Sequence, residues 1–326
     1  MPAALSWTWR PGGGPVIGFV FLAVSAALLI AGAELFAENA AGAGRRLGVS
    51  FLAVGLILAG AEPEEFVTAV IAASRHHPAI GAGDAIGANV TMLTLVIGAA
   101  CVISPMSFGP RLRGYAAGAA VTGGAAALAV TGGVSRPEGI GLVVLYLVIV
   151  AVIWRAERRP PALGEAAELT SDRDTEAGRR SPALALALML AGIALMIVGG
   201  RLAVAGAERL TAALPLADSA VGLTFVALAT VAELFALIWA AARRGIDELA
   251  LAGVLGSALY NATATLGAAA VITPVPARGL LAPAIAAAVL PVALIVFSPR
   301  RRLGRPLGVL LLTGYAVYLF LILRRA

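Results

Sequence analysis

Charged residues are scarce in this sequence. Only 13% of its 326 residues are Asp, Glu, Lys or Arg, whereas a soluble domain carries roughly 25%. A chain this long with so few charges cannot cover a water-exposed surface, which excludes an ordinary soluble protein. Because 60% of the residues are hydrophobic, we expect the chain to lie in lipid.

Other features that the sequence lacks exclude further classes of protein. The single cysteine, Cys101, rules out an internal disulfide. All 24 basic residues are arginines and the net charge is +6, which basic loops of a membrane protein explain. No polar stretch is long enough for a nucleic-acid-binding domain, so no nucleic acid is expected as a partner. Neither H-E-x-x-H nor G-x-S-x-G occurs, so an intramembrane enzyme is a weak alternative.

Apolar segments of spanning length recur along the whole chain, each with the about 20 residues that a bilayer requires. A single segment of this kind could be a buried helix of a soluble protein, but ten in succession could not. We therefore predict an all-α integral membrane protein with about ten transmembrane helices. The segments lie at 15–40, 48–74, 79–103, 114–133, 138–155, 182–208, 219–243, 247–273, 279–297 and 306–323.

A charged stretch at residues 156–181 divides the chain. It is rich in Glu, Asp and Arg and has few apolar residues, as solvated linkers do. We predict a first repeat of five helices at 1–155, a linker at 156–181, and a second repeat of five helices at 182–326.

The two halves resemble one another at a constant offset in residue number. Val102–Pro105 reappears as Val271–Pro274, an offset of 169. Five spans are an odd number, so the second copy must enter the membrane from the opposite side. The pattern therefore predicts an inverted-topology repeat, which is typical of secondary transporters. Two glycine pairs share the same offset: Gly87 with Gly256, and Gly98 with Gly267.

The arginines predict the orientation in the cell (inner) membrane. When the loops alternate between two sides, the side of the 156–181 linker holds 16 arginines and the opposite side holds 7, with Arg201 inside a span. Cytoplasmic loops carry the excess of basic residues. We expect a multi-pass protein with a cytoplasmic linker and with both termini extracellular.

Three carboxylates lie within one apolar span, at Glu62, Glu64 and Glu65, next to Pro63. Each charge at membrane depth costs about 2.5–3.5 kcal/mol, so the acids must face water, a cation or each other. Glu62 and Glu65 are three residues apart and share a helical face, whereas Glu64 is expected to point elsewhere. The proline frees backbone carbonyls that can also face an ion.

The matching span of the second half contains one acid, Glu233, which aligns with Glu65 at an offset of 168. Repeat symmetry would bring these two carboxylates together near the midplane. Hard cations prefer oxygen ligands, and two carboxylates balance one divalent charge. We therefore predict Glu65 and Glu233 as ligands of a metal cation, with Thr230 one turn before Glu233 in the same site.

Further polar side chains lie in the spans that follow the acidic ones. Ser257 and Asn261 are four residues apart on one helical face, and Asn89 occupies the corresponding span of the first half. We expect these three to complete the shell of ligands. Possible additional members of the site are Glu62, Glu64, Asp84 and Thr68.

These stretches resemble the motifs of the sodium/calcium exchanger (calcium:cation antiporter) superfamily. Its members carry in each half a motif like G-T-S-x-P-E-L/F and then one like G-N-x-x-G-S-N-I-x-N. Here Glu65–Thr68 and Glu233–Leu234 resemble the acid and the residues after it. Gly253–Ser257 resembles the second motif, with Asn261 at its last amide, and Asp84–Asn89 resembles its first-half counterpart. The resemblance covers nearly the whole chain.

Several positions depart from the family pattern, so the resemblance is to a divergent, prokaryotic-type member. The first-half hydroxyl pair is absent, Ala88 replaces the family serine, and Met92 replaces the amide that matches Asn261. The register of the first motif could also shift by one, which would place Glu64 where Glu65 is expected. Fewer neutral oxygens and more carboxylates favour proton coupling over three-sodium coupling.

The resemblance implies an exchanger-like fold and antiport of a cation, with Ca2+ moving against Na+ or H+. Alternating access would occur around a carboxylate site at the midplane, and no cofactor is expected beyond the transported cations. Partners are these inorganic cations and membrane lipid. A monovalent cation/proton antiporter and a non-transporting paralogue remain alternatives, and an intramembrane enzyme is less favoured. The sequence leaves the oligomeric state open.

Overall fold

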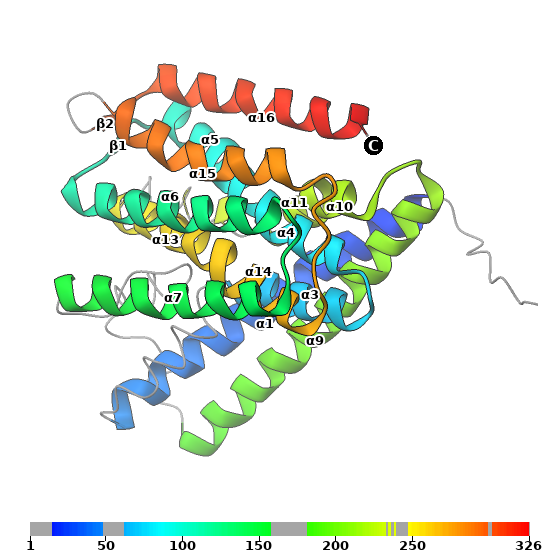
Figure 1. The fold of residues 1–326 in the computed structure, drawn as a ribbon. Helices are drawn as coiled ribbons and strands as arrows, with labels where there is room; N and C mark the ends of the chain where they lie inside the picture. The colour runs from blue at the N-terminus through cyan, green and yellow to red at the C-terminus, as the bar shows by residue number, and fades with distance from the viewer. Residues whose placement is uncertain are drawn as a thin grey trace, which may run out of the picture.

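The structure, a computed structural model, is a bundle of long helices (Figure 1). In the described part of the chain the β-structure consists of two-residue strands and one isolated bridge. The residues described are 15–47, 62–157, 181–232, 234–235, 238, 247–298 and 302–325.

Proline marks the start of several helices, because its fixed φ suits the first helical turn. Pro15, Pro63, Pro78, Pro110 and Pro182 are each the first residue of one. In the first half the helices are α1 (Pro15–Leu47), α3 (Pro63–Ser74), α4 (Pro78–Thr91), the π-helix η1 (Met92–Val96), α5 (Ile97–Ile103), α6 (Pro110–Val130) and α7 (Arg136–Glu157).

The second half follows the same plan. Its helices coincide with predicted apolar segments, as do those of the first half. They are α9 (Pro182–Ala213), α10 (Asp218–Val221), η3 (Gly222–Val226), α11 (Ala227–Thr230), α13 (Asp247–Tyr260), η4 (Asn261–Thr265), α14 (Leu266–Ile272), α15 (Leu281–Val296) and α16 (Arg305–Arg325).

The outer surface of the bundle is apolar. Among the described residues, six helices are long and apolar enough to cross a membrane, and Asp218–Thr230 and Leu281–Val296 form shorter apolar helices. Large hydrophobic side chains point outward along them, as at Val152, Val16 and Val296, which are 60–70% exposed. Lipid is the solvent in which such a surface is stable, so the prediction of an all-α membrane fold is confirmed.

The central helices of the two halves match residue by residue. The run α4–η1–α5 corresponds to α13–η4–α14, and the π-helices begin at Met92 and Asn261, which share the offset of 169. Thr94 and Thr263 hold the same place in them, and each hydroxyl donates to the carbonyl oxygen four residues earlier. The offset predicted from a few motifs therefore extends to backbone geometry.

Strand pairing shows that the halves are related by a pseudo-twofold exchange. The strands β1 (Met106–Ser107) and β2 (Arg302–Leu303) pair antiparallel, with Met106 opposite Leu303. An antiparallel bridge elsewhere joins Val134 to Val275. The offset of 169 carries residue 106 to 275 and residue 303 back to 134, so the two pairings are copies with the halves exchanged.

Side-chain contacts repeat this exchange. The Arg305 Nε donates to the Val102 carbonyl oxygen at 3.2 Å, and the Arg136 Nε donates to the Val271 carbonyl oxygen at 3.1 Å. The same offset relates Arg136 to Arg305 and Val102 to Val271. Each half thus packs its outer helices on the inner helices of the other, and the predicted inverted repeat is confirmed.

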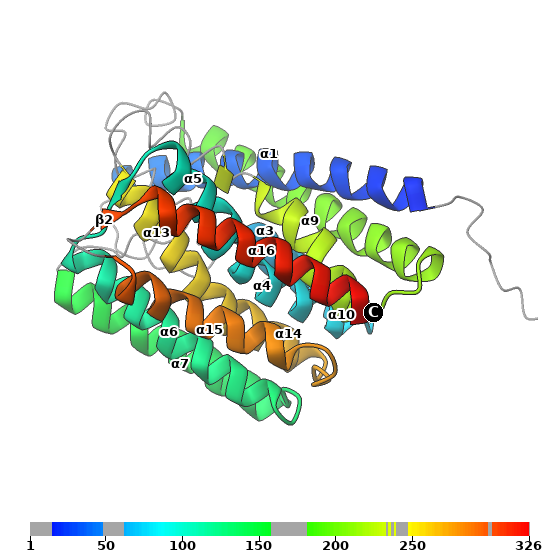
Figure 2. The same ribbon diagram turned by 90° about the horizontal axis from the view of Figure 1, so that it is seen from above.

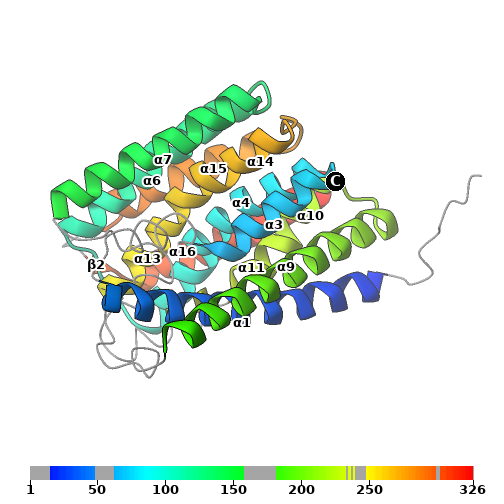
Figure 3. The same ribbon diagram turned by 90° about the horizontal axis from the view of Figure 1, so that it is seen from below.

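The helices α1 and α9 cross along one flank of the bundle (Figures 2 and 3). Small residues let their backbones approach closely: a Cβ atom on Gly192 would lie 2.6 Å from the Gly32 carbonyl oxygen. The Ser25 hydroxyl donates to the Gly199 carbonyl oxygen at 2.9 Å across the same crossing.

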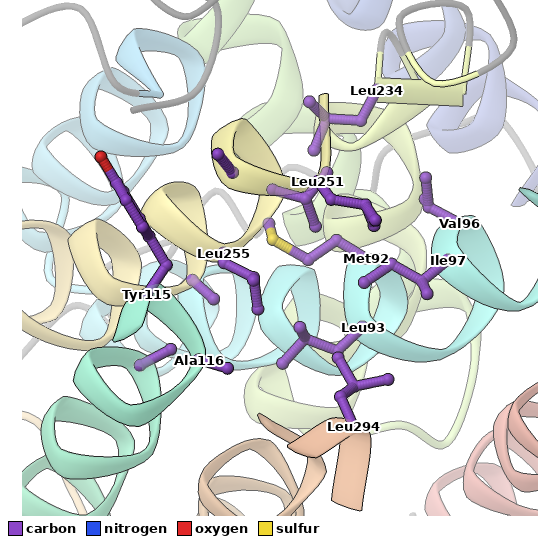
Figure 4. Close-up of a cluster of buried hydrophobic side chains, with 14 of the residues drawn as sticks. Met92, Leu93, Val96, Ile97, Tyr115, Ala116, Leu234, Leu251, Leu255 and Leu294 are labelled. Atoms are coloured by element: carbon purple, nitrogen blue, oxygen red, sulfur yellow. The ribbon is translucent and has the colours of Figure 1, made fainter. Parts of the chain in front are cut away.

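A hydrophobic cluster joins η1, α13 and α15 (Figure 4). Met92, Leu93, Leu251, Leu255 and Leu294 are fully buried in it. Met92 occupies the position where the family motif has an amide, and it packs here as an apolar residue.

The turn between α3 and α4 is tied to the second half. The His77 Nδ1 lies 2.8 Å from an Asp218 carboxylate oxygen, and Arg75 pairs with Glu208 at 3.5 Å. Most of the charged linker predicted at 156–181 lies outside the described residues: α7 ends at Glu157, residues 158–180 are not described, and Ser181 caps α9. The boundaries and solvated state of the linker therefore remain predictions.

Candidate cation-binding site

The acidic motif is the start of a helix inside the protein. Pro63 is the first residue of α3, Glu64 and Glu65 lie in its first turn, and Glu62 precedes it in a non-helical conformation. The first turn of a helix exposes unpaired N–H groups and favours negative charge. The order Glu-Pro-Glu-Glu therefore suits a helix N-terminus. The first part of the predicted span, 48–61, lies outside the described residues.

The three glutamates converge on one point. Glu62, Glu64 and Glu65 each place a carboxylate oxygen within 4.8 Å of the others, and all three side chains are 0% exposed. The expectation that Glu64 points elsewhere was wrong. It assumed regular helical spacing through Glu62, but Glu62 has φ −154° and ψ 75°, so its side chain does not follow the helical register.

Ser257 connects this cluster to the second half. From α13, its hydroxyl lies within hydrogen-bond distance of Glu62 Oε1 and 3.0 Å from the Gly253 carbonyl oxygen. The structure thus places one predicted ligand directly against an acid that was ranked only as a possible member of the site.

A second contact between the halves involves Asp84 and Thr230. The Thr230 hydroxyl donates to Asp84 Oδ1 at 3.0 Å, and both side chains are buried. Glu65 lies close enough to interact with each of them. Asp84 is therefore a central acid of the arrangement, and α4 and α11 meet at it.

Of the two predicted asparagines, Asn89 bonds across the two halves and Asn261 bonds within its own helix. The Asn89 Nδ2 donates to the Ala258 carbonyl oxygen at 2.8 Å. Residue 258 is the repeat counterpart of residue 89, so this bond lies on the pseudo-twofold axis. The Asn261 Oδ1 accepts a hydrogen bond from Thr265 at 3.0 Å, and its Nδ2 has no bonding partner. In this orientation Asn261 would have to turn its amide to offer oxygen to a cation.

Several buried oxygen atoms here lack hydrogen-bond partners among the described residues. They include both carboxylate oxygens of Glu65, one of Glu62, one of Asp84 and the Thr68 hydroxyl. Buried polar groups are nearly always paired, and the ion pairs found within the described ranges include none of these acids. Oxygens so arranged can hold a hard cation, protons or both.

Glu233 lies outside the described residues, so its pairing with an acid of the first half remains a prediction. The offset of 169 that relates α4, η1, α5 and α7 to their counterparts would match Glu233 with Glu64, whereas an offset of 168 matches it with Glu65. Because Glu64 and Glu65 lie in one cluster, either register would bring the second-half acid to the same place.

Tyr260 is a neighbour of the site that sequence reasoning missed. It is fully buried, its ring centroid is 5.2 Å from that of Tyr146, and it is near enough to the three glutamates to interact with them. An aromatic residue directly before Asn261 in an apolar span could have indicated a neighbour of the site, but apolar packing explains such a residue equally well.

Comparison with known proteins decides the family. A family model described as sodium/calcium exchanger protein matches residues 17–155 and 184–324, which covers both halves. The chain belongs to the sodium/calcium exchanger family. This is a family of transporters, so the expectation that the protein is not an enzyme is confirmed, and cation exchange is its general class of function.

Two relatives extend over the full length of this exchanger-family chain. A putative antiporter, CaxA, from Alkalimonas amylolytica is 29% identical over 325 residues, covering 94% of this chain and 99% of the relative. The inner membrane protein YrbG of Escherichia coli is 27% identical over 313 residues, covering 93% and 94%.

The fold is shared with a solved exchanger. A structure of the sodium–calcium exchanger NCX_Mj soaked with Na+ and Sr2+ matches with a TM-score of 0.62 and 23% identity, covering 93% of this chain and 97% of that one. At this identity the match establishes the fold alone.

Proposed function

We propose that this protein is a secondary antiporter that exchanges Ca2+ for H+ or Na+ by alternating access. The observation that carries the proposal is a buried cluster of carboxylates with unpaired oxygens, between two inverted halves. Family membership, a relative named as an antiporter and an exchanger structure soaked with Na+ and Sr2+ support it.

The spacing of the acids suits a calcium ion. Calcium takes six to eight oxygen ligands at about 2.3–2.6 Å, so two oxygens on one ion are at most about 5 Å apart. The carboxylate oxygens of Glu62, Glu64 and Glu65 lie within 4.8 Å of one another. The remaining ligands would come from Asp84, Glu233, Ser257, Thr230, Asn261, Asn89 and Thr68.

Charge balance favours protons as counter-ions. Four buried acids, at Glu62, Glu64, Glu65 and Asp84, face one region, and a divalent cation neutralises only two negative charges. Uncompensated charge in a membrane interior is costly. The carboxylates that the cation does not neutralise would therefore be protonated. The bound ion would exchange with protons as the site changes sides.

Alternating access would use the contacts between halves. Ser257 on Glu62 and Thr230 on Asp84 each join one half to the other at the site. Cation binding at these contacts would neutralise the acids and let the halves rock about the pseudo-twofold axis. The same proposal places the protein in the inner membrane, with the linker cytoplasmic.

Flux measurements in proteoliposomes test this function. Calcium uptake should be driven by an opposing pH gradient, an opposing Na+ gradient or both, and Glu62→Gln should remove it. A matched change at the exposed Glu248 should leave uptake intact. Calcium-independent exchange of Na+ or K+ for H+ would instead identify a monovalent cation/proton antiporter. Absence of any coupled flux in folded protein would identify a non-transporting paralogue.

A further inference from the structure

A groove of about 470 Å3 opens on the outside of the bundle, away from the acidic cluster. Its walls are α10 and η3 on one side and α15 and α16 on the other. The lining is apolar, with Leu223, Leu281, Ile285 and Ile322 among its members, apart from Ser219 and Arg278. Leu281 and Ile285 are 37% and 49% exposed, so the groove faces the lipid.

Among the described residues of the lining, Arg278 alone is charged, and it lies at one end of the groove. Arg278 is in the turn before α15, at the end of the bundle where α10 begins and α16 ends (Figure 2). No hydrogen bond or ion pair joins its guanidinium to another described residue. Ile285 lies four residues beyond Leu281, the first residue of α15, which places it about 6 Å further along the helix. The groove is therefore amphipathic along its length.

The turn is built to bring Arg278 to this position. Gly279 has φ +80°, a conformation that glycine adopts readily, and a Cβ atom there would lie 2.7 Å from the Ser219 hydroxyl oxygen. The turn thus packs directly on α10, and the arginine beside it is held at the rim.

The inverted repeat supplies an internal comparison. The buried positions of α6 and α15 correspond at an offset of 168: Leu112 matches Leu280 and Tyr115 matches Pro283. The Tyr115 ring is 2% exposed and fills space in the first half. Its counterpart Pro283 lines the groove. At this position the two halves therefore differ, with a buried aromatic ring in α6 and a proline at the groove in α15.

We propose that this groove binds an anionic phospholipid, with its phosphate on Arg278 and one acyl chain along Leu281, Ile285 and Ile322. Charge complementarity selects the headgroup, because an unpaired arginine at a membrane interface attracts anionic lipid. The apolar walls would hold the acyl chain, and the volume of the groove is within the range of known ligand sites.

The lipid would brace the helix that leads to the cation site. The run α10–η3–α11 carries Ser219 and Leu223 in the groove wall and ends at Thr230, which bonds to Asp84. The Tyr318 hydroxyl of α16 already donates to the Leu223 carbonyl oxygen at 2.9 Å. An acyl chain between these helices would hold η3 against α16.

Native mass spectrometry of the purified protein tests the proposal. Delipidated protein is incubated with dioleoyl phosphatidylglycerol or with dioleoyl phosphatidylcholine, which carry the same chains but different headgroups. The wild type should retain phosphatidylglycerol about fivefold better, as expected for one arginine near an anionic headgroup. Arg278→Gln should remove this preference, and Ala282→Trp, which fills the groove, should lower retention of both lipids.

Matched variants separate the groove from general effects. Arg155→Gln changes another exposed arginine at the end of a helix, and Ala151→Trp adds a ring to an exposed face of α7, so both should behave as wild type. Equal retention of the two lipids by the wild type, or an unchanged preference in Arg278→Gln, would overturn the proposal. So would protection against thermal unfolding by inorganic phosphate alone that equals that of phosphatidylglycerol.

Discussion

Among single residues, Asp84 links the two halves of the site most directly. Its Oδ1 accepts a hydrogen bond from Thr230 of the second half, and its Oδ2 is buried without a partner. A carboxylate in this position can bind a cation on one oxygen while the other is held by the hydroxyl. The negative charge of Asp84 and its hydrogen bond to Thr230 can therefore be tested separately.

The change Asp84→Asn should separate these two roles. The amide oxygen can still accept the Thr230 hydrogen bond, so the variant should fold, but the negative charge is lost. We expect calcium transport to fall by on the order of tenfold or more, the scale on which altered metal sites lose function. Calcium flux in proteoliposomes checks this, with Glu248→Gln as the control. Wild-type flux in Asp84→Asn would remove Asp84 from the site.

Ser257 provides a test of hydroxyl support for the acids. Its hydroxyl contacts Glu62, and hydrogen bonds to charged groups contribute about 1.5–3 kcal/mol. Ser257→Ala should therefore weaken calcium binding by roughly tenfold to a hundredfold, measured by calorimetry on the purified protein. Thr224→Val is the control, because the Thr224 hydroxyl bonds to the backbone at Ala220. Equal affinities in the two variants would contradict a role for Ser257.

The sequence indicated which buried polar residues to consider for the site, but it did not predict how they are arranged. Buried acids in apolar spans are conspicuous because each needs compensation, so Glu62, Glu64, Glu65 and Asp84 were all found. Their ranking depended on side-chain direction, and the regular helical spacing assumed for it does not hold at Glu62, whose backbone is non-helical. Periodicity assumes a regular helix, and it fails where a helix starts.

At the scale of elements, helix positions could be read from hydropathy while their internal irregularities could not. Each described helix coincides with a predicted apolar segment. The π-helices η1, η3 and η4 were not anticipated, because an insertion of one residue barely alters an apolar run. All three carry a threonine at their third position, and its hydroxyl bonds four residues back. Such back-bonding is known to bend helices.

The α1–α9 crossing leads to a stability prediction. In Gly192→Ala the new Cβ would lie 2.6 Å from the Gly32 carbonyl oxygen, so the helices must separate. Overpacking of this kind costs about 1–3 kcal/mol, and the unfolding midpoint should fall. Gly124→Ala is the control, since no atom lies within 4 Å of its new Cβ, and replacing a helical glycine by alanine stabilises by up to about 1 kcal/mol. Thermal unfolding of both variants in the same detergent tests this prediction. Equal unfolding midpoints would contradict the close crossing of α1 and α9.

For the whole molecule, the offset of 169 was visible in the sequence because it falls on glycines and prolines. Such residues are needed where backbones touch: Gly98 contacts Gly308, and Gly139 contacts Gly267 in the exchanged position. The exchange itself, in which each half supports the other, could not be read from motifs. The prediction of which surface faces the cytoplasm rests on the arginine content of the loops alone, and labelling measures it directly.

Cysteine labelling tests the predicted orientation. The native Cys101 is 0% exposed, so introduced cysteines should react without background. The 16-to-7 distribution of arginines places residue 170 in the cytoplasm and residue 325 outside. An impermeant maleimide applied to intact cells should therefore label Arg325→Cys but not Thr170→Cys, and permeabilised cells should show labelling of both. The reverse pattern in intact cells would invert the whole molecule. The site would keep its structure, because the two halves are related by a pseudo-twofold axis, but the acids would face the opposite compartments during transport.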